Sequence, residues 1–360
     1  MGPLVFGAGR VPSVKTIGYV PLERSLNRPG DRRRFPAYVA HRGIGCSVVD
    51  SWDGMDLVVL TTEADLVRWR SAPTGVRVVF DLPDAVLDER PSFRSRTRGL
   101  AKWATGSLHR PVFRHQLAIR RLVERADAVV CSTPEHAMKL ADIADNVHVA
   151  LDYHGEFGVW PPKTRTDGQG LDVLWEGLLP TLDSVRQVVP ALRDLARSRE
   201  VVLHLVTDRF APRYMNRFLV CDVERLVARW GVRIKVHDWS QDTLQKVARL
   251  CDFAVVPVDG EDPYAMGKPE NRMRIFWRLG LPVVASDTPA HRRAIEVAGV
   301  SVDTLCGRPV DWDETIRWFA EDQESRQVAA EAGHAAAIGP YGDESVLGAW
   351  DGVMESVGFV

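Results

Sequence analysis

The chain has 360 residues, of which 45% are hydrophobic and 26% charged, and its net charge is −2 at pH 7. This composition is typical of a globular protein and excludes intrinsic disorder and collagen-like repeats. No run of 18 apolar residues predicts a membrane-spanning helix, and a chain of this length is expected to form two domains.

Four short apolar segments in the first half predict buried strands. They are residues 15–20 (KTIGYV), 56–61 (DLVVLT), 76–81 (VRVVFD) and 128–132 (AVVCS). Continuous apolar runs that end in polar residues are typical of parallel strands covered on both faces. Helical patterns lie between some of these runs, so the first half predicts repeated βα units.

The periodicity stops at residues 152–170, where prolines and glycines accumulate, and then resumes. Further strands are predicted at 172–175, 201–206, 253–257 and 282–285, with a helix at 184–197 between the first two. Strands that alternate with helices in both halves predict an α/β fold of two Rossmann-like domains facing across a cleft. An amphipathic helix is expected at 344–357, close to the end of the chain.

Residues 259–287 carry the most informative motif. A loop follows a buried strand, contains Lys268, Asn271 and Arg272, and leads directly into a helix. Backbone N–H groups at a helix N-terminus, together with Lys and Arg side chains, can bind an anion such as a diphosphate. The alternative is a helix start whose cations contact only water.

The segment KPENRMRIFWRLGLPVVAS (268–286) resembles the donor-site segment of GT-B-fold glycosyltransferases, in particular the retaining, GT4-like group. Their pattern there is K-x-x-N-[KR], a helix, and then G-x-P-V-V-A-S. Residues 173–179 and 236–257 are similar to the glycine loop and the nucleobase loop of the same domain, and residues 78–84 and 126–133 to acceptor-domain strands. The resemblance implies a GT-B fold with an acceptor-binding domain over 1–160, a donor-binding domain over 170–335, and a C-terminal helix over 336–360 that crosses back to the N-terminal domain.

The resemblance also implies transfer of a sugar from a UDP- or GDP-type nucleoside diphosphate-sugar, with retention and without a metal or other cofactor. Lys268 and Arg272 would offset charge on the leaving diphosphate, and Gly177 would let the backbone approach the phosphates or the sugar. The implied donor-binding residues are Gly177, Leu178, Asp208, Arg209, Trp239, Ser240, Lys268, Asn271 and Arg272. For Trp239, packing in the core is an equal alternative.

Two positions depart from the family pattern. Ile275 stands where the second glutamate of an E-x7-E motif is expected, and residues 176–184 lack the Arg and Lys that usually follow the glycine loop. Either Arg186 or Arg209 could substitute for these cations. Two alternatives to a transferase therefore stay open: a GT-B-fold sugar-nucleotide epimerase, and a degenerate, non-catalytic sugar-nucleotide-binding partner.

Polar residues of the first half are candidates for binding a glycan, lipid-linked or small-molecule acceptor, because they are expected to overhang the cleft. These candidates are Asn27, Arg32, Arg33, Arg34 and His136. Asp81 and Asp84 stand at the end of a buried strand on the cleft side, where a carboxylate could be the catalytic base for an acceptor hydroxyl or could bond a sugar. For Asp84, capping of the next helix is the alternative.

Charge is distributed unevenly along the chain. Residues 1–165 contain 24 Lys and Arg against 18 Asp and Glu, and residues 90–121 hold nine cations, interleaved aromatics and no carboxylate. Such a segment suits an anionic membrane surface. An exposed basic helix pair is the alternative, and no motif predicts nucleic-acid binding. Because residues 1–15 lack a secretory signal and the five cysteines form no CxxC pair, we expect the protein in the cytoplasm, either free or on the inner face of the membrane.

Overall fold

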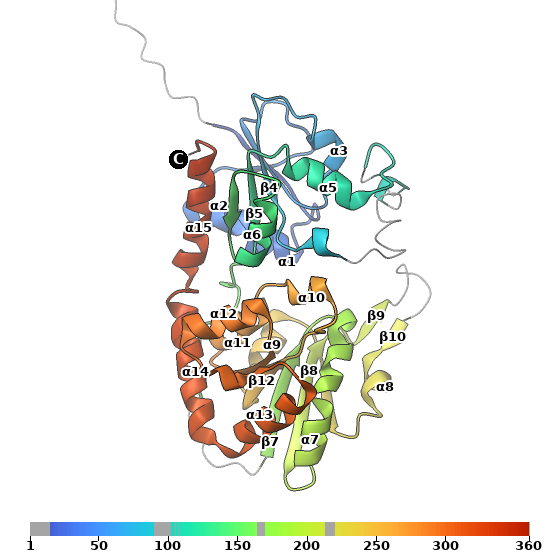
Figure 1. Ribbon diagram of the computed structural model, residues 1–360, viewed down its shortest axis with the longest axis vertical. Coiled ribbons are helices and arrows are strands. Elements are labelled where there is room, and N and C mark those ends of the chain that lie inside the picture. Colours follow the sequence, from blue (N-terminus) through green and yellow to red (C-terminus); the bar gives the residue numbers. More distant parts are fainter. Residues whose placement is uncertain are drawn as a thin grey trace, which may run out of the picture.

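The computed structural model describes residues 15–89, 102–104, 106, 108–163, 170–212 and 220–359. Figure 1 shows two α/β domains stacked along the long axis, with the first half of the chain above and most of the second half below. Each domain contains a six-stranded parallel sheet. The predicted pair of Rossmann-like domains is confirmed.

The N-terminal sheet has the strand order β2-β1-β3-β4-β5-β6. Its strands are β1 (Ile17–Val20), β2 (Ser47–Val48), β3 (Leu57–Leu60), β4 (Arg77–Asp81), β5 (Ala128–Cys131) and β6 (Val147–Val149). The helical segments around it are α1 (Pro29–Arg33), α2 (Phe35–Arg42), α3 (Leu66–Trp69), η1 (Val86–Asp88), α5 (His115–Val123) and α6 (Pro134–Leu140). Because apolar clusters cover both faces of the sheet, β3 and β5 are buried along their whole length.

The C-terminal sheet has the order β11-β8-β7-β12-β13-β14, and a separate antiparallel pair joins β9 to β10. The strands are β7 (Gly170–Glu176), β8 (Glu200–Thr207), β9 (Phe210–Pro212), β10 (Val220–Asp222), β11 (Arg233–Asp238), β12 (Phe253–Val256), β13 (Val283–Ser286) and β14 (Leu305–Cys306). The helical segments are η2 (Leu179–Gln187), α7 (Val189–Leu195), α8 (Val223–Val227), α9 (Gln241–Ala248), α10 (Pro263–Met266), α11 (Asn271–Arg278), α12 (Pro289–Ala298), η3 (Val302–Thr304), α13 (Pro309–Glu321), α14 (Gln323–Ile338) and α15 (Asp343–Ser356).

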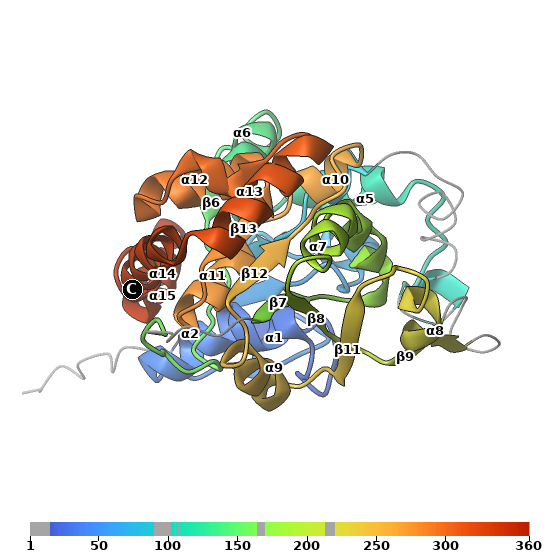
Figure 2. The same cartoon turned by 90° about the horizontal axis from the view of Figure 1, so that it is seen from below.

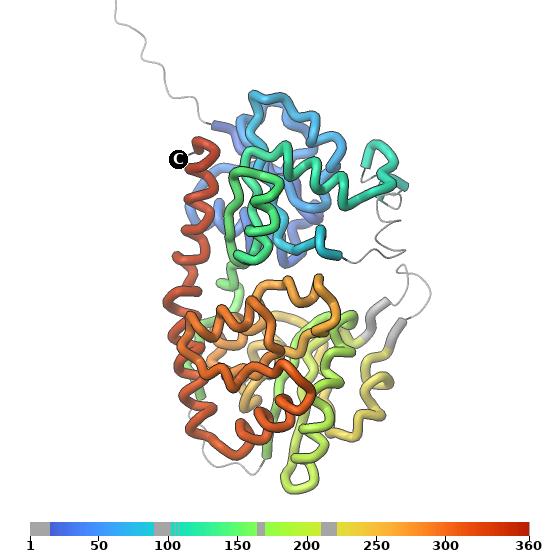
Figure 3. Tube along the Cα trace, in the orientation of Figure 1, coloured from blue at the N-terminus to red at the C-terminus, as the bar shows by residue number. Residues whose placement is uncertain are grey.

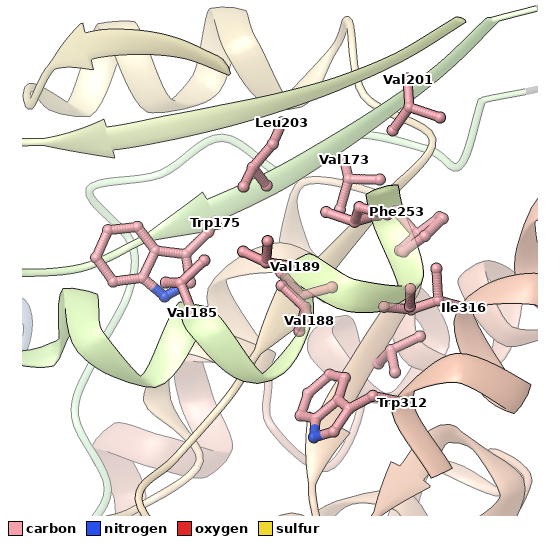
Figure 4. Close-up of a cluster of buried hydrophobic side chains, with 14 of the residues drawn as sticks. Val173, Trp175, Val185, Val188, Val189, Val201, Leu203, Phe253, Trp312 and Ile316 are labelled. Atoms are coloured by element: carbon pink, nitrogen blue, oxygen red, sulfur yellow. The ribbon is translucent and has the colours of Figure 1, made fainter. Parts of the chain in front are cut away.

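One face of this sheet packs against η2, α7 and α13. Figure 4 shows Trp175 of β7 and Trp312 of α13 within this buried apolar cluster, together with valines of both layers. The single helix predicted at 184–197 is wrong: a 3₁₀ segment ends at Gln187, and the α-helix begins at Val189. Pro190 causes the division, because proline lacks an N–H group and is tolerated only in the first turn of a helix.

The helix α15 returns to the N-terminal domain, as the resemblance implied. Its apolar face includes Trp350, which lies fully buried against Phe35 and Tyr38 of α2. Arg42 of α2 also pairs with Glu344 of α15. Figure 3 shows the chain passing between the domains twice on the same side, once after β6 and once between α14 and α15. Among the described residues, no helix has the length and apolarity needed to cross a membrane.

Candidate active site

Residues that follow strand ends in both sheets meet between the two domains. Asn271 donates from Nδ2 to Asp152, which follows β6, with an N···O distance of 2.8 Å. Glu135, which follows β5, forms an ion pair with Arg293 of α12. The short helix α10 also contacts η1 of the N-terminal domain. Parallel α/β sheets commonly place their ligands at this edge.

The N-terminus of α11 is the clearest anion-binding feature of this interface. No side chain caps the helix, so N–H groups of its first turn have no partner from a capping residue. Arg272 lies in that turn and donates from Nη1 to the backbone oxygen of Glu176, 3.2 Å away. Burial lowers the pKa of Arg272, against the opposing charge of Glu176, and the guanidinium forms no ion pair with any described carboxylate. A half-buried cation beside free helix N–H groups is suited to an anionic ligand.

Two other residues of the predicted motif have different surroundings. Lys268 is exposed, and its ammonium lies 4.9 Å from the centre of the Tyr264 ring. Asn271 already donates to Asp152, whose other oxygen accepts from Nη1 of Arg34 at 3.0 Å. Asn271 therefore ties the donor-site loop to the N-terminal domain.

The glycine loop is shaped by packing. A Cβ atom at position 177 would lie 2.7 Å from the Trp175 ring and 2.8 Å from Oγ1 of Thr181, so a larger residue there would force these side chains to shift even without a ligand. Leu178 is 65% exposed.

The remaining predicted donor-binding residues are Trp239, Ser240, Arg209 and Asp208. Trp239 lies beside the loop and donates from Nε1 to Oε1 of Glu176 at 2.9 Å. Ser240 caps α9 by accepting from the backbone N–H of Thr243. Arg209 is occupied by Glu224 (3.0 Å) and by the backbone oxygen of Val236 (3.1 Å), and Asp208 is exposed. The Ser240 hydroxyl is thus used as a helix cap. Arg209 is already paired through its terminal nitrogens, and its Nε is buried without a hydrogen-bond partner among the described residues.

The hypothesis that Asp81 is a general base does not fit the geometry. Asp81 is 3% exposed, and both its oxygens accept from Arg34 at 2.6 to 2.9 Å. Arg34 is 1% exposed and also donates to Ser132 and to the backbone oxygen of Ala150. Both residues belong to a buried ion-pair network, so Arg34 is unavailable to an acceptor as well.

Arg32 and Arg33 are also paired. Both contact Glu156 in the connection between the domains, and Nε of Arg33 lies 2.6 Å from Oε1. Glu156 further accepts from Gln241 of α9 at 2.8 Å, and the backbone oxygen of Asn27 accepts from Arg32. These contacts place both arginines at the interface and offset part of their charge.

Asp84 and His136 remain the best-placed polar side chains on the acceptor side. Asp84 is half-buried and does not cap η1, which has no side-chain cap. His136 is 4% exposed, and neither ring nitrogen has a hydrogen-bond partner. Burial lowers the pKa of His136 to about 4, although the charges of Asp88 and Asp84 oppose this. His136 is therefore a neutral imidazole near Asp84 at neutral pH.

Sequence reasoning missed Glu176, Glu156, Asp152 and Arg293. Glu176 stood within the quoted glycine-loop segment, and its position at a strand end was the only local signal. The other three have partners far away in the sequence. Among the described residues, no group of three or more His, Cys, Asp or Glu side chains is arranged to hold a metal ion.

No protein-family model matches the chain, and no curated protein matches it in sequence. Solved structures do match. HepE of Anabaena, in complex with UDP and glucose, has a TM-score of 0.63 at 14% identity, and the match covers 95% of this chain and 100% of that one. WaaG, a glycosyltransferase involved in lipopolysaccharide biosynthesis, has a TM-score of 0.59 at 12% identity, with 95% and 100% covered. This chain has the GT-B fold.

The GT-B match extends to a longer protein. TarM has a TM-score of 0.59 at 11% identity, and the match covers 89% of this chain but only 57% of TarM. At these identities the likeness establishes the fold alone. In this GT-B fold, the uncapped helix α11 and Arg272 lie in the C-terminal domain, on the side that meets the N-terminal domain.

Proposed function

We propose that this protein is a glycosyltransferase that moves a sugar from a nucleoside diphosphate-sugar to a glycan or lipid-linked acceptor, with retention. The observation that carries the proposal is the N-terminus of α11, where uncapped N–H groups adjoin a half-buried Arg272 without an ion-pair partner among the described residues. The HepE structure, which contains UDP and glucose, supports a nucleotide donor for this fold.

The chemistry follows from where charge develops. Glycosyl transfer leaves negative charge on the departing diphosphate, and pre-oriented donors that meet this charge can each lower the barrier by ~3 kcal/mol. Arg272 and the backbone N–H groups of α11 would be these hydrogen-bond donors, and Lys268 could approach the diphosphate from the exposed loop. On the acceptor side, Asp84 is the candidate base, because Asp81 is occupied by Arg34.

Calorimetry with UDP and with GDP tests the proposal. One of the two should bind the wild type, and Arg272→Met should weaken that binding ~10- to 100-fold, since a charge-assisted hydrogen bond contributes ~1.5–3 kcal/mol. Arg197→Met is the matched control, because the Arg197 side chain is 78% exposed and forms a surface ion pair with Asp194. Equal affinity in wild type and Arg272→Met would place the diphosphate elsewhere.

Incubation with the donor sugar separates the alternatives. Slow hydrolysis or transfer supports the transferase, and formation of an epimer supports an epimerase. Binding without turnover supports a non-catalytic partner, which buried Ile275 favours because an apolar side chain occupies the position of the expected glutamate.

We further propose that α5 and the turn before it contact an anionic membrane, which would place the protein on the inner face of that membrane. Phe113, in the turn before α5, is 70% exposed, and Leu117 of α5 is 37% exposed. Arg110, Arg114 and Arg121 are also exposed. Figures 1 and 2 show α5 on the side of the domain opposite α15. Residues 90–101, 105 and 107 of the predicted basic segment lie outside the described residues.

Vesicle co-sedimentation tests the membrane contact. Exposed aromatic and basic side chains together should favour anionic over neutral lipid, with binding that falls as salt shortens the Debye length from ~10 Å at 0.1 M. The double variant Phe113→Asp/Arg114→Glu should lose this binding and keep its fold. Equal binding to anionic and neutral vesicles would refute the contact.

A further inference from the structure

Glu176 ends β7 and places a carboxylate beside Arg272. One oxygen, Oε1, accepts from the indole N–H of Trp239 at 2.9 Å. The other, Oε2, has no hydrogen-bond partner among the described residues and is partly accessible to solvent. The indole therefore fixes the carboxylate while one oxygen stays open at the interface between the domains.

The packing around Glu176 does not require a charged side chain. The Trp239 indole needs only an acceptor, which a glutamine amide oxygen would also supply. Arg272 donates to the backbone oxygen of Glu176, and no described cation forms an ion pair with its carboxylate. Burial nevertheless raises the pKa of Glu176, although the charges of Arg272 and Arg33 oppose this. Keeping the carboxylate ionised at this position therefore costs free energy.

The nature of the open oxygen defines what can bind to it. An ionised carboxylate accepts hydrogen bonds and repels phosphate, so it cannot itself contact a diphosphate held by Arg272. The groups of a nucleoside diphosphate-sugar that complement it are hydrogen-bond donors, namely the N–H groups of the base and the hydroxyls of the ribose and of the transferred sugar. The hydroxyls flank the diphosphate directly on both sides, and Glu176 adjoins the diphosphate site through its backbone contact with Arg272.

We infer that Glu176 binds a hydroxyl group of the donor through Oε2 and so positions the donor beside Arg272, with Trp239 holding the carboxylate. This inference rests on the proposed function. It adds a hydroxyl subsite at the end of β7 to the diphosphate site at the N-terminus of α11.

The test compares wild type with Glu176→Gln by calorimetry, using the nucleoside diphosphate that the wild type binds, its 2′-deoxy and 3′-deoxy forms, and its glucose, galactose and N-acetylglucosamine conjugates. In Glu176→Gln the amide still offers an acceptor to Trp239, but the open oxygen or its charge is replaced. If a ligand hydroxyl bonds this oxygen in the wild type, the variant should bind that ligand ~10- to 100-fold more weakly. Glu261→Gln is the control, an exposed carboxamide substitution on the loop before α10.

The two sources of the hydroxyl give different patterns. If it belongs to the ribose, Glu176→Gln weakens binding of the plain nucleotide, and the deoxy form that lacks the bonded hydroxyl binds wild type and variant equally. If it belongs to the sugar, the plain nucleotide binds both equally and only a sugar conjugate is affected. Trp239→Phe, which frees the carboxylate, should weaken the same ligand less.

Two results would overturn the inference in different ways. Equal affinity of wild type and Glu176→Gln for every nucleotide and conjugate, with Arg272→Met still weakened, would remove the hydroxyl subsite and leave the proposed function intact. No binding of any nucleotide to the wild type would overturn the proposed function, and the subsite with it.

Discussion

Replacing Arg34 by methionine tests whether the Arg34–Asp81 pair stabilises the fold or serves catalysis. The pair is almost completely buried, and Arg34 donates three hydrogen-bond contacts to the carboxylate. Arg34→Met leaves Asp81 as an uncompensated buried charge, which costs ~3–5 kcal/mol of unfolding free energy. This is a large part of the ~5–15 kcal/mol that stabilises a typical domain.

The pH dependence of the loss has a definite sign. In the wild type, burial raises the pKa of Asp81 although the charge of Arg34 opposes it. Without Arg34, the folded-state pKa of Asp81 rises further above its unfolded value, so the folded protein takes up a proton as the pH falls. The stability deficit of Arg34→Met should therefore be largest at pH 7 and shrink towards pH 4.

Urea unfolding followed by tryptophan fluorescence measures these quantities. The double variant Arg34→Met/Asp81→Leu removes both charges and should recover much of the loss, because a buried ion pair can be replaced by apolar groups at little cost. A loss below ~1 kcal/mol in Arg34→Met would refute the structural role assigned to the pair. So would a double variant that loses the sum of both single losses, or an Asp81→Asn variant that keeps its stability but has no activity.

Two further predictions concern a buried histidine and a left-handed glycine. Burial lowers the pKa of His136 from 6.5 to about 4. The stability that this histidine contributes above pH 6.5 should therefore be lost as the pH falls towards 4, by ~3 kcal/mol in total. In urea unfolding, the variant His136→Phe should lose less stability than the wild type between pH 7 and pH 5, and an unchanged pH profile would contradict the assignment. Gly280 has φ 73°, and a Cβ there would lie 2.6 Å from the backbone oxygen of Pro161. Gly280→Ala should therefore cost ~2–4 kcal/mol, whereas Gly299→Ala, at φ 68° with open space around it, should cost only ~1–2 kcal/mol. Equal losses in these two variants would show that the backbone angle alone decides the cost.

The architecture could be predicted because it depends on local patterns. Continuous apolar runs such as that of β3 mark strands buried on both faces, and polar residues after them mark the edge where a ligand binds. The start of α11 and the apolar stripe of α15 could be located in the same way, since helical periodicity is a property of neighbouring residues. Pro190 shows the limit of this approach, because the periodic pattern continued across the start of a new helix, in whose first turn Pro190 lies.

The partners of the charged side chains were decided only by the tertiary structure. Asp81 ends a buried strand just as a catalytic carboxylate would, but Arg34, 47 residues away, occupies both its oxygens. Asp152 joins Arg34 to Asn271, which are 118 and 119 residues from it, and Glu176 meets an indole 63 residues away. A sequence pattern reports which residues are buried or lie at a strand end, whereas ion pairing depends on which side chains from distant segments reach the same place once both sheets and α15 have packed.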